Sequence, residues 1–296
     1  MIDEVDSNSL DLSQVEPLIR FAIREDIGKG DLTSSSVLPR GAKARGTFVV
    51  KEGGIIAGLA VIPLIFRIIN EKVKFIPLTH DGETVASGMP VAQITGPAIS
   101  ILSGERVALN FLQRLSGIAT LAARFVEEVR GTKAKILDTR KTTPGWRYLE
   151  KYAVRMGGAL NHRMGLYDRV LIKDNHLRLS ANQPVSEAVS RARKRCPAGT
   201  LIEVEAENLV QVEEALSASA DIIMLDNMSV KLINQAIHMI RNATGTPLIE
   251  ASGGITLRNA RSIAQTGVDW ISVGELTHSA KALDIALDLE PIGRSD

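Results

Sequence analysis

Three short segments decide the fold: LIEVEAE (201–207), DIIMLD (221–226) and PLIEASGG (247–254). Each is a largely apolar run of the length of a β-strand, and helix-length sequence separates each from the next. Strands of parallel sheets, which are covered on both faces, have this continuous apolar character. The stretch therefore predicts successive strand–helix units built on a parallel sheet.

The same pattern continues on both sides of this stretch. Three further segments show it: AKILDT (134–139), RVLIKD (169–174) and DWISVGE (269–275). About six or seven such units, spaced roughly 20 to 35 residues apart, favour a closed α/β barrel over an open sheet. Polar residues end each segment, and ligands of α/β barrels bind at the carboxyl ends of the strands.

The first part of the chain has a different texture. Residues 13–24 carry apolar side chains at helical spacing, and Ser13 followed by Glu16 is a capping-box signature, so we expect a helix. Short β-branched runs such as TFVV (47–50) and VAQIT (91–95) alternate with turn sequences and predict a small antiparallel sheet.

Two more elements follow from residue spacing. Residues 101–129 have an apolar helical face, which we expect to be broken near Gly117. Residues 283–289 alternate apolar and polar side chains with a period of two. We interpret this tail as a strand that returns to the N-terminal sheet, with a short helix as the alternative.

The composition excludes several classes of protein. The 296 residues hold 35 Lys and Arg against 34 Asp and Glu, a net charge of +1. This balance argues against a nucleic-acid binder, which needs a basic surface. The single Cys196 excludes an intramolecular disulfide and fits the cytoplasm. We expect no membrane span, because the longest apolar stretch, residues 55–66, is too short for a bilayer. We expect no signal peptide, because no charged, apolar and small-residue pattern opens the chain.

One segment is strongly basic. Residues 140–176 hold eight Lys or Arg and three Asp or Glu, an excess of +5 that leaves −4 for the remaining chain. A concentrated basic segment in a nearly neutral chain favours a small polyanionic ligand over a polymer. Arg147, Lys151 and Arg155 are spaced four apart, and we interpret these three as a solvated helix face instead.

Two places in this segment put cations beside turns. Arg140 and Lys141 lie in DTRKTTPG (138–145), directly after a predicted strand. Arginine offers a planar fork to carboxylate or phosphate, and lysine offers a point charge. His162 and Arg163 follow a Gly-Gly turn. Strand-end position favours a binding role over a solvated loop for the first pair.

Charged residues also end the next strands. Lys173 closes an apolar strand, where an ammonium needs a partner, and either Asp174 or a ligand phosphate could supply it. Glu203 and Glu205 are two apart on a strand and so face the same way. With Asp226, they could bind a divalent cation through water or accept hydrogen bonds from ribose.

Glycines mark the last two strand ends. ASGGIT (251–256) and SVGEL (272–276) each follow a strand and precede helical sequence, so they predict phosphate cradles. The sequence has no GxxxxGK[ST] loop, no HExxH and no GxGxxG after a predicted strand. These absences argue against P-loop, zincin and Rossmann chemistry.

Taken together, the chain resembles the quinolinate phosphoribosyltransferases, also called carboxylating nicotinate-nucleotide pyrophosphorylases. The motifs that carry the resemblance are EDIGKGDLTS (25–34), GERVALNFLQRLSGIAT (104–120), DTRKTTPG (138–145), EKYAVRMGGALNHR (150–163), LIKDNH (171–176), IEVEAENL (202–209), MLDN (224–227) and EASGGIT (250–256). They cover nearly the whole chain.

The resemblance implies an α/β protein of two domains. Residues 1–117 plus 279–296 would form an α/β sandwich, and residues 118–278 an incomplete (β/α) barrel of six or seven parallel strands. A head-to-tail homodimer with shared active sites is implied, with a higher oligomer left open. The implied reaction joins quinolinate to 5-phosphoribosyl 1-diphosphate in de novo NAD biosynthesis. It gives nicotinate mononucleotide, diphosphate and carbon dioxide, with Mg²⁺ and no organic cofactor.

The resemblance also assigns residues to quinolinate. Arg140, His162 and Arg163 would bind its carboxylates, together with Arg106 reaching across from the other subunit. Thr139 would line the same substrate site. Such a cluster of cations favours a diacid, because a monoacid would leave some of them unpaired.

A second group of residues would act on the phosphoribosyl donor. Lys141 and Lys173 would bind the diphosphate, and Glu205 and Asp226 would hold ribose hydroxyls and water-linked Mg²⁺, with Glu203 assisting. These two lysines, Glu205 and Asp226 are therefore the implied catalytic residues. The implied phosphate cradle consists of Ser252, Gly253, Gly254 and Gly274.

Other readings stay open at this point. The same scaffold could serve another acceptor, as in nicotinate phosphoribosyltransferase or in the homologue found with molybdate transport genes. A barrel aldolase could form a Schiff base on Lys173. A non-catalytic sensor of phosphorylated ligands is a third alternative.

Overall fold

The computed structural model describes residues 9–243 and 245–293. The chain divides into two compact units. The first consists of Met1–Ala123, Thr142–Gly158 and Ser279–Asp296, and the second of Arg124–Lys141 and Ala159–His278. The outermost residues of the expected sandwich domain, 1–8 and 294–296, lie outside the described residues. The domain limits expected from the sequence stay a prediction.

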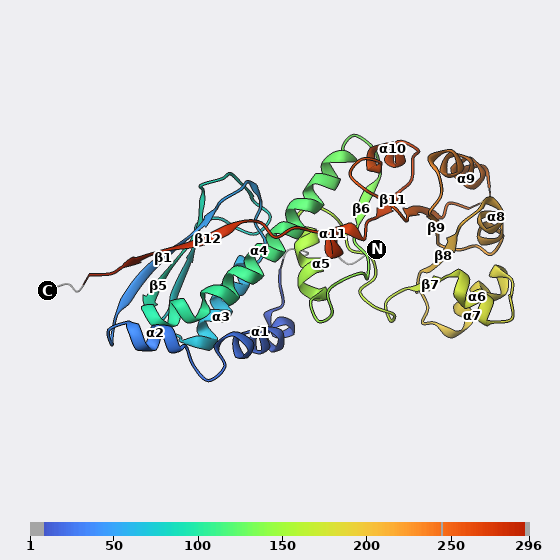
Figure 1. Ribbon diagram of the computed structural model, residues 1–296. Helices are drawn as coiled ribbons and strands as arrows, with labels where there is room; N and C mark the ends of the chain where they lie inside the picture. Colours follow the sequence, from blue (N-terminus) through green and yellow to red (C-terminus); the bar gives the residue numbers. More distant parts are fainter. Residues whose placement is uncertain (1–8, 244, 294–296) are drawn as a thin grey trace. The chain divides into compact units, whose positions relative to one another are not determined.

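An antiparallel sheet of four strands forms the centre of the first unit. Its order is β12-β1-β5-β3 (Figure 1). The strands are β1 (Lys43–Val50), β3 (Lys74–Pro77), β5 (Pro90–Pro97) and β12 (Ile285–Pro291), and a separate pair consists of β2 (Gly54–Ile55) and β4 (Thr84–Val85). The register of β1 with β12 runs from Ala44↔Pro291 to Val50↔Ile285. Both the small antiparallel sheet and the returning tail strand are thus confirmed.

Among residues 9–243 and 245–293, six helical segments belong wholly or partly to the first unit. They are α1 (Leu12–Ile27), α2 (Leu32–Val37), the short 3₁₀ segment η1 (Leu59–Val61), α3 (Ile62–Ile69), α4 (Ala98–Glu128) and α5 (Arg147–Met156). The predicted N-terminal helix is confirmed, but its cap is Asp11 rather than Ser13. The Asp11 carboxylate accepts hydrogen bonds from the Ser13 backbone N–H at 3.0 Å and from its hydroxyl at 2.6 Å, which draws Ser13 into the first turn.

Helix α4 runs without interruption from Ala98 to Glu128, so Gly117 does not end it. The glycine instead allows a close approach. A Cβ at position 117 would lie 1.9 Å from the carbonyl oxygen of Lys281, in the segment that leads into β12. The same segment is fixed to α4 by the Leu283 N–H, which donates to the Gln113 carbonyl oxygen at 2.9 Å.

The solvated face expected for Arg147, Lys151 and Arg155 is wrong for Lys151, in the middle of α5. Lys151 is fully buried, and so is its neighbour Glu150. Glu150 accepts hydrogen bonds from Arg114 Nη2 at 2.9 Å and from the Thr143 hydroxyl at 2.9 Å and backbone N–H at 3.1 Å. Buried charge that is paired in this way belongs to the packing of the unit, not to a solvent-facing stripe.

Six parallel strands form the sheet of the second unit, in the order β6-β11-β10-β9-β8-β7 (Figure 1). They are β6 (Lys135–Leu137), β7 (Val170–Ile172), β8 (Ile202–Ala206), β9 (Ile222–Asp226), β10 (Leu248–Ser252) and β11 (Trp270–Ser272). All of the predicted strand segments are confirmed. Beyond β6, Leu160 forms a parallel bridge with Leu137. Strands β6 and β7 are the two edge strands of this sheet and are not paired with each other in the described part of the chain, so the barrel is incomplete.

Helices follow the strands in turn. They are α6 (Asp174–Leu179), α7 (Val185–Arg195), α8 (Leu209–Ser217), α9 (Val230–Asn242), α10 (Ala260–Ala264) and α11 (Glu275–His278). Helix α7 packs on β7 and β8, and α8 packs on β8 and β9. This cover explains why a strand such as β9 is apolar where it is buried, from Ile222 to Leu225.

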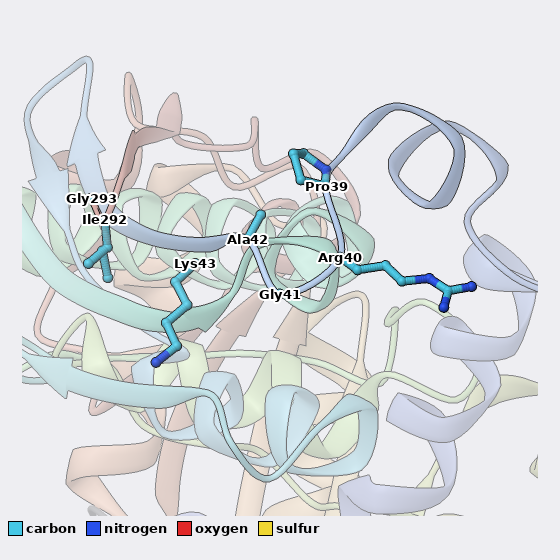
Figure 2. Close-up of a pocket in the computed structure, with 7 residues that line it drawn as sticks. All are labelled: Pro39, Arg40, Gly41, Ala42, Lys43, Ile292 and Gly293. Carbon is cyan, nitrogen blue, oxygen red and sulfur yellow. The ribbon is translucent and has the colours of Figure 1, made fainter. Parts of the chain in front are cut away.

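Among the described residues, no helix is both long enough and apolar enough to cross a membrane. A surface hollow in the first unit is lined by Pro39, Arg40, Gly41, Ala42, Lys43, Ile292 and Gly293 (Figure 2). The side chains of Arg40 and Lys43 extend in different directions there, so their charges do not converge on one point. None of these residues has an expected role in the site.

Candidate active site

The register of the parallel sheet determines which side chains share a face. Glu205 is paired with Met224 across β8 and β9, and Met224 is paired with Glu250 across β9 and β10. Two residues further along both strands, Asp226 is paired with Ser252. Paired residues of parallel strands point to the same face, and residues two apart on a strand do so as well. Glu203, Glu205, Asp226, Glu250 and Ser252 therefore share one face of the sheet.

Lys173 finds its partner on the neighbouring strand. Its ammonium donates a hydrogen bond to a carboxylate oxygen of Glu205 and forms an ion pair with it. The nearby Asp174, which the sequence offered as a partner, pairs with Arg178 at 2.9 Å instead. Asp174 begins α6 and turns away from the strand end, whereas the pairing of β7 with β8 brings Glu205 alongside Lys173.

Glu205 is half-buried among other charges. Burial raises the pKa of Glu205 above its ordinary value, the hydrogen bond and charge of Lys173 lower it, and the charges of Asp226 and Asp174 raise it. The contribution of Asp226 shows that the two acids are close enough to repel each other. A cation between them would relieve this repulsion, so both fit the oxygen ligands of Mg²⁺ or its bound water.

A buried cluster lies on the same face as Glu205. His162 Nε2 is 3.3 Å from Glu203 Oε2 and 3.6 Å from Glu250 Oε1, and Arg169 Nη1 is 3.6 Å from Glu203 Oε2. Both glutamates are fully buried. Burial raises the pKa of Glu250 well above its ordinary value, and the charge of Glu203 raises it further. The cluster therefore favours the protonated form of Glu250.

Glu250 is a residue that the sequence reasoning missed as a site residue. It lies inside the apolar segment PLIEASGG, where its signal was a lone acid two residues before Ser252. A charged residue at that spacing must face inward with Ser252. The inward position, rather than any motif, would have marked it.

His162 and Arg163 are held by backbone and side-chain hydrogen bonds. The buried Asp138 accepts from the His162 N–H at 2.8 Å and from Asn161 Nδ2 at 2.7 Å. The Arg163 N–H donates to His162 Nδ1 at 2.8 Å, and Arg163 Nη1 donates to the Arg169 carbonyl oxygen at 3.0 Å. The ring nitrogens of His162 thus face the Arg163 backbone on one side and two carboxylates on the other.

Arg140 lies near Arg163. Burial lowers the pKa of Arg163, and the charge of Arg140 lowers it further, while the charges of Glu203 and Asp168 raise it. Two of the cations expected to bind quinolinate are therefore brought together. Arg106 lies exposed on α4 in the first unit, and a single chain does not test its expected reach into another subunit.

The loop after β6 meets the end of β11. The Lys141 N–H donates to Thr139 Oγ1 at 3.1 Å, and the Thr277 hydroxyl donates to the Lys141 carbonyl oxygen at 2.8 Å. A Cβ at Gly274 would lie 3.1 Å from Lys141 Cδ. Lys141 therefore lies directly against the glycine that was expected to bind phosphate.

The expected phosphate loop, Ser252–Gly254, follows β10. Gly253 and Gly254 have φ angles of +86° and +61°, in the left-handed region that favours glycine. Helical structure does not begin directly after the loop, since α10 starts at Ala260. Any phosphate bound here would therefore depend on the loop's own backbone N–H groups.

Two family models match the chain. The model described as quinolinate phosphoribosyl transferase, N-terminal domain, matches residues 31–116, and the model for the C-terminal domain of the same family matches residues 118–288. Together they cover most of the chain.

Proteins of similar sequence carry related names. A probable nicotinate-nucleotide pyrophosphorylase (carboxylating) of Bacillus subtilis is 45% identical over 276 residues, which are 93% of this chain and 93% of that protein. The nicotinate-nucleotide pyrophosphorylase (carboxylating) of Mycobacterium leprae is 42% identical, with 92% of this chain and 95% of that protein covered.

A solved structure with a related name has a similar fold. The crystal structure of NadC from Streptococcus pyogenes superposes with a TM-score of 0.90 at 40% identity, covering 96% of this chain and 99% of that one. Sequence and fold thus match over nearly the same residues. The chain belongs to the quinolinate phosphoribosyltransferase family.

Proposed function

We propose that this chain transfers the phosphoribosyl group of 5-phosphoribosyl 1-diphosphate to the ring nitrogen of quinolinate, with loss of carbon dioxide. The observation that carries the proposal is the buried pair His162 and Arg163, fixed by hydrogen bonds to Asp138 and to the His162 ring, with the charge of Arg140 close enough to lower the pKa of Arg163. Cations held together at a partly buried place favour a ligand with several negative charges. The two carboxylates of quinolinate meet that requirement.

Arg140 and Arg163 would bind these carboxylates directly, because a guanidinium group can donate two parallel hydrogen bonds to a carboxylate. His162 would border the same place. Its ring accepts a hydrogen bond from the Arg163 N–H, so it also holds Arg163 in position. Thr139 would line the site, and the partner's Arg106 would complete it.

The donor would occupy the carboxyl ends of β7 to β9. Lys141 and Lys173 would bind the diphosphate, and Glu205 and Asp226 would accept hydrogen bonds from ribose hydroxyls. The ion pair of Lys173 with Glu205 supports this arrangement, because it places a diphosphate-binding cation next to a ribose-binding acid. Glu203 is fully buried against His162 and Arg169, which supports a role in holding them rather than in contacting ribose.

The phosphate of the donor would bind at the Ser252–Gly254 loop and Gly274. The left-handed glycines of the loop support this, since they allow the backbone to approach an anion closely. Lys141 lies against Gly274 and would add a positive charge at the same place.

The expected Mg²⁺ would be held through water by Glu205 and Asp226, whose mutual repulsion it would relieve. When bound, it would stabilise negative charge on the departing diphosphate. A second group, His162, Glu203 and Glu250, also holds three potential ligand atoms within 4.8 Å. We do not place Mg²⁺ there, because the group includes a nitrogen ligand and Arg169 already lies against Glu203.

The chemistry needs few catalytic groups. Departure of diphosphate leaves oxocarbenium-like positive charge on the ribose, as at other glycosidic centres, and the carboxylates of Glu205 and Asp226 would stabilise it. The quinolinate nitrogen attacks that carbon without first losing a proton. When the carboxylate next to that nitrogen departs as carbon dioxide, its electron pair stays on the ring carbon, where the adjacent pyridinium nitrogen stabilises it, and a proton from water then adds to that carbon. Orientation and electrostatics would then supply the catalysis.

We further propose a homodimer with shared active sites, in the cytoplasm. The shared active sites are supported by Arg106, an exposed cation on α4 that lies in one of the family motifs. The cytoplasmic location is supported by the single cysteine, Cys196.

The test is release of carbon dioxide from quinolinate labelled in the carboxyl group next to the nitrogen. Release should depend on both 5-phosphoribosyl 1-diphosphate and Mg²⁺, and nicotinate mononucleotide should accumulate in equal amount. Nicotinate offered instead of quinolinate should react far more slowly. Efficient use of nicotinate, or trapping of Lys173 by borohydride with a carbonyl substrate, would overturn the proposal.

A further inference from the structure

Asn227 is the residue directly after Asp226, at the end of β9, and it has an unusual backbone. Its φ angle is 55°, in the left-handed region, which only three other non-glycine residues adopt among the described parts of the chain: Ala181, Asn182 and Ser219. Asparagine tolerates this region better than most side chains. The chain turns here from β9 toward Ser229, which caps α9.

The side chain of Asn227 reaches back to Asp226. Its amide Nδ2 donates a hydrogen bond to Asp226 Oδ2 at 2.7 Å. A donor fixed on one oxygen restricts rotation of the carboxylate and leaves Oδ1 to accept from a ribose hydroxyl or a bound water. The left-handed turn is what lets a side chain bond to the residue immediately before it.

The backbone of Asn227 reaches the next strand. Its N–H donates to the Ser252 carbonyl oxygen at 2.9 Å, at the start of the phosphate loop. Asp226 and Ser252 are themselves register partners across β9 and β10. The hydrogen bond extends this pairing by one residue past the end of β9.

The phosphate loop is shaped around the Asn227 side chain. A Cβ at Gly253 would lie 2.3 Å from Asn227 Oδ1 and 2.8 Å from Asn227 N. Gly253, with its φ of +86°, therefore has both a backbone and a packing reason to be glycine. Asn227 thus contacts the acid on one side and the phosphate loop on the other.

We propose that Asn227 is a positioning residue for phosphoribosyl transfer: it holds the Asp226 carboxylate and the Ser252–Gly254 loop in one fixed arrangement. The inference rests on the proposed function, because it takes Asp226 to bind ribose and the loop to bind the phosphate of the same donor. Asn227 couples the two ends of one ligand, the sugar hydroxyls and the phosphate, without contacting the reacting carbon.

The first test is Asn227→Gly, which keeps the left-handed backbone and the N–H donor and removes only the amide. We expect kcat/KM for 5-phosphoribosyl 1-diphosphate to fall about tenfold to a hundredfold, the range expected for a hydrogen bond to a charged group. The KM for quinolinate should change less than about twofold.

Asn182→Gly is the matched control, because Asn182 has a φ of 56° and is exposed in the loop after α6. The two variants should have similar melting temperatures, and the control should keep wild-type kinetics. If Asn227→Gly and Asn182→Gly have the same kcat/KM for 5-phosphoribosyl 1-diphosphate and the wild type is active, the positioning role is refuted. A wild type that fails to release carbon dioxide would instead refute the proposed function.

A second variant, Asn227→Asp, keeps size and backbone tolerance but places a carboxylate against Asp226. It should lose more kcat/KM than Asn227→Gly, and wild-type kinetics would contradict the use of the amide as a donor. A double-mutant cycle completes the test. In an Asp226→Asn background, Asn227→Gly should cost less than about a third of its loss in the wild type, since it acts through Asp226. Independent, multiplicative losses would overturn the coupling.

Discussion

Replacing Gly117 by alanine should destabilise the protein, although alanine is the better helix former. Gly117 lies in the interior of α4, where the exchange by itself would stabilise a helix by about 1 kcal/mol. The added Cβ, however, would lie 1.9 Å from the Lys281 carbonyl oxygen and 2.9 Å from its carbonyl carbon. The 281 carbonyl must therefore move by roughly 1 Å in a close-packed region.

That movement acts on a segment that α4 holds by hydrogen bonds. The Leu283 N–H donates to the Gln113 carbonyl oxygen at 2.9 Å, and Arg114 Nη1 donates to the Ala280 carbonyl oxygen at 2.9 Å. Weakening both should cost about 1 to 3 kcal/mol, and overpacking a further 1 to 3 kcal/mol. After subtraction of the helix gain, the expected net loss is about 1 to 5 kcal/mol, or a melting temperature lower by at least about 2 °C.

Thermal unfolding followed by circular dichroism would measure the effect. Asn110→Ala is the control, because Asn110 is exposed on the same helix and its replacement reports the helix-propensity gain alone. The control should keep or slightly raise the melting temperature. If Gly117→Ala raises it as well, the close approach of the 281 carbonyl does not govern this position, and the reasoning fails.

Three further predictions concern the site. Arg140→Ala should raise the KM for quinolinate at least about tenfold while calorimetric binding of 5-phosphoribosyl 1-diphosphate largely survives; near-normal turnover would count against its role. Arg106→Ala mixed with Lys173→Ala should regain partial activity in verified mixed dimers if the sites are shared, and no recovery would argue against sharing. Because burial raises the pKa of Glu250, the folded state retains its proton above the pH at which the unfolded chain loses it, so the contribution of Glu250 to stability falls as pH rises. The free energy of unfolding of Glu250→Gln should therefore rise relative to that of the wild type between roughly pH 5 and 7, by at most about 1.4 kcal/mol per pH unit. Urea titrations at several pH values would measure it, and a difference between the two proteins that does not change with pH would refute the prediction.

The strands of the barrel could be predicted from the sequence because their burial is local information. A strand covered on both faces is apolar over its buried length, as β9 is from Ile222 to Leu225, and the apolar run gives the limits of β9 to within one residue. The tail strand β12 was predictable for the related reason that its side chains alternate.

Tertiary information decided the features that sequence reasoning missed. Gly117 reads as a gap in the apolar face of its helix until the path of the 281 carbonyl is known. Lys151 reads as a solvated cation because its spacing with Arg147 and Arg155 is that of a helix face, yet it is buried. Spacing places a side chain on a face but does not say what covers that face.

The residues of the candidate site also divide into those that local sequence could predict and those that depend on the tertiary structure. Strand-end positions marked Arg140, Lys173 and Asp226, because ligands of barrels gather there. The partner of Lys173 and the importance of Glu250 depended on which strands are neighbours. The order β10-β9-β8-β7 in one sheet is a property of the folded chain, and no local pattern states it.

The pairing of β1 with β12 has a consequence for biosynthesis. Strand β1 comprises residues 43–50, and the strand that covers one of its edges, β12, comprises residues 285–291. The two strands are therefore far apart in the sequence. A ribosome releases the first segment long before the second, so this edge must stay unpaired while the strands of the barrel are made. All six barrel strands, which end at Ser272, emerge earlier and can pair before the tail arrives. The nascent first unit is therefore the part of the chain most in need of protection from edge-to-edge aggregation, and completion of its sheet is expected to be the last folding step.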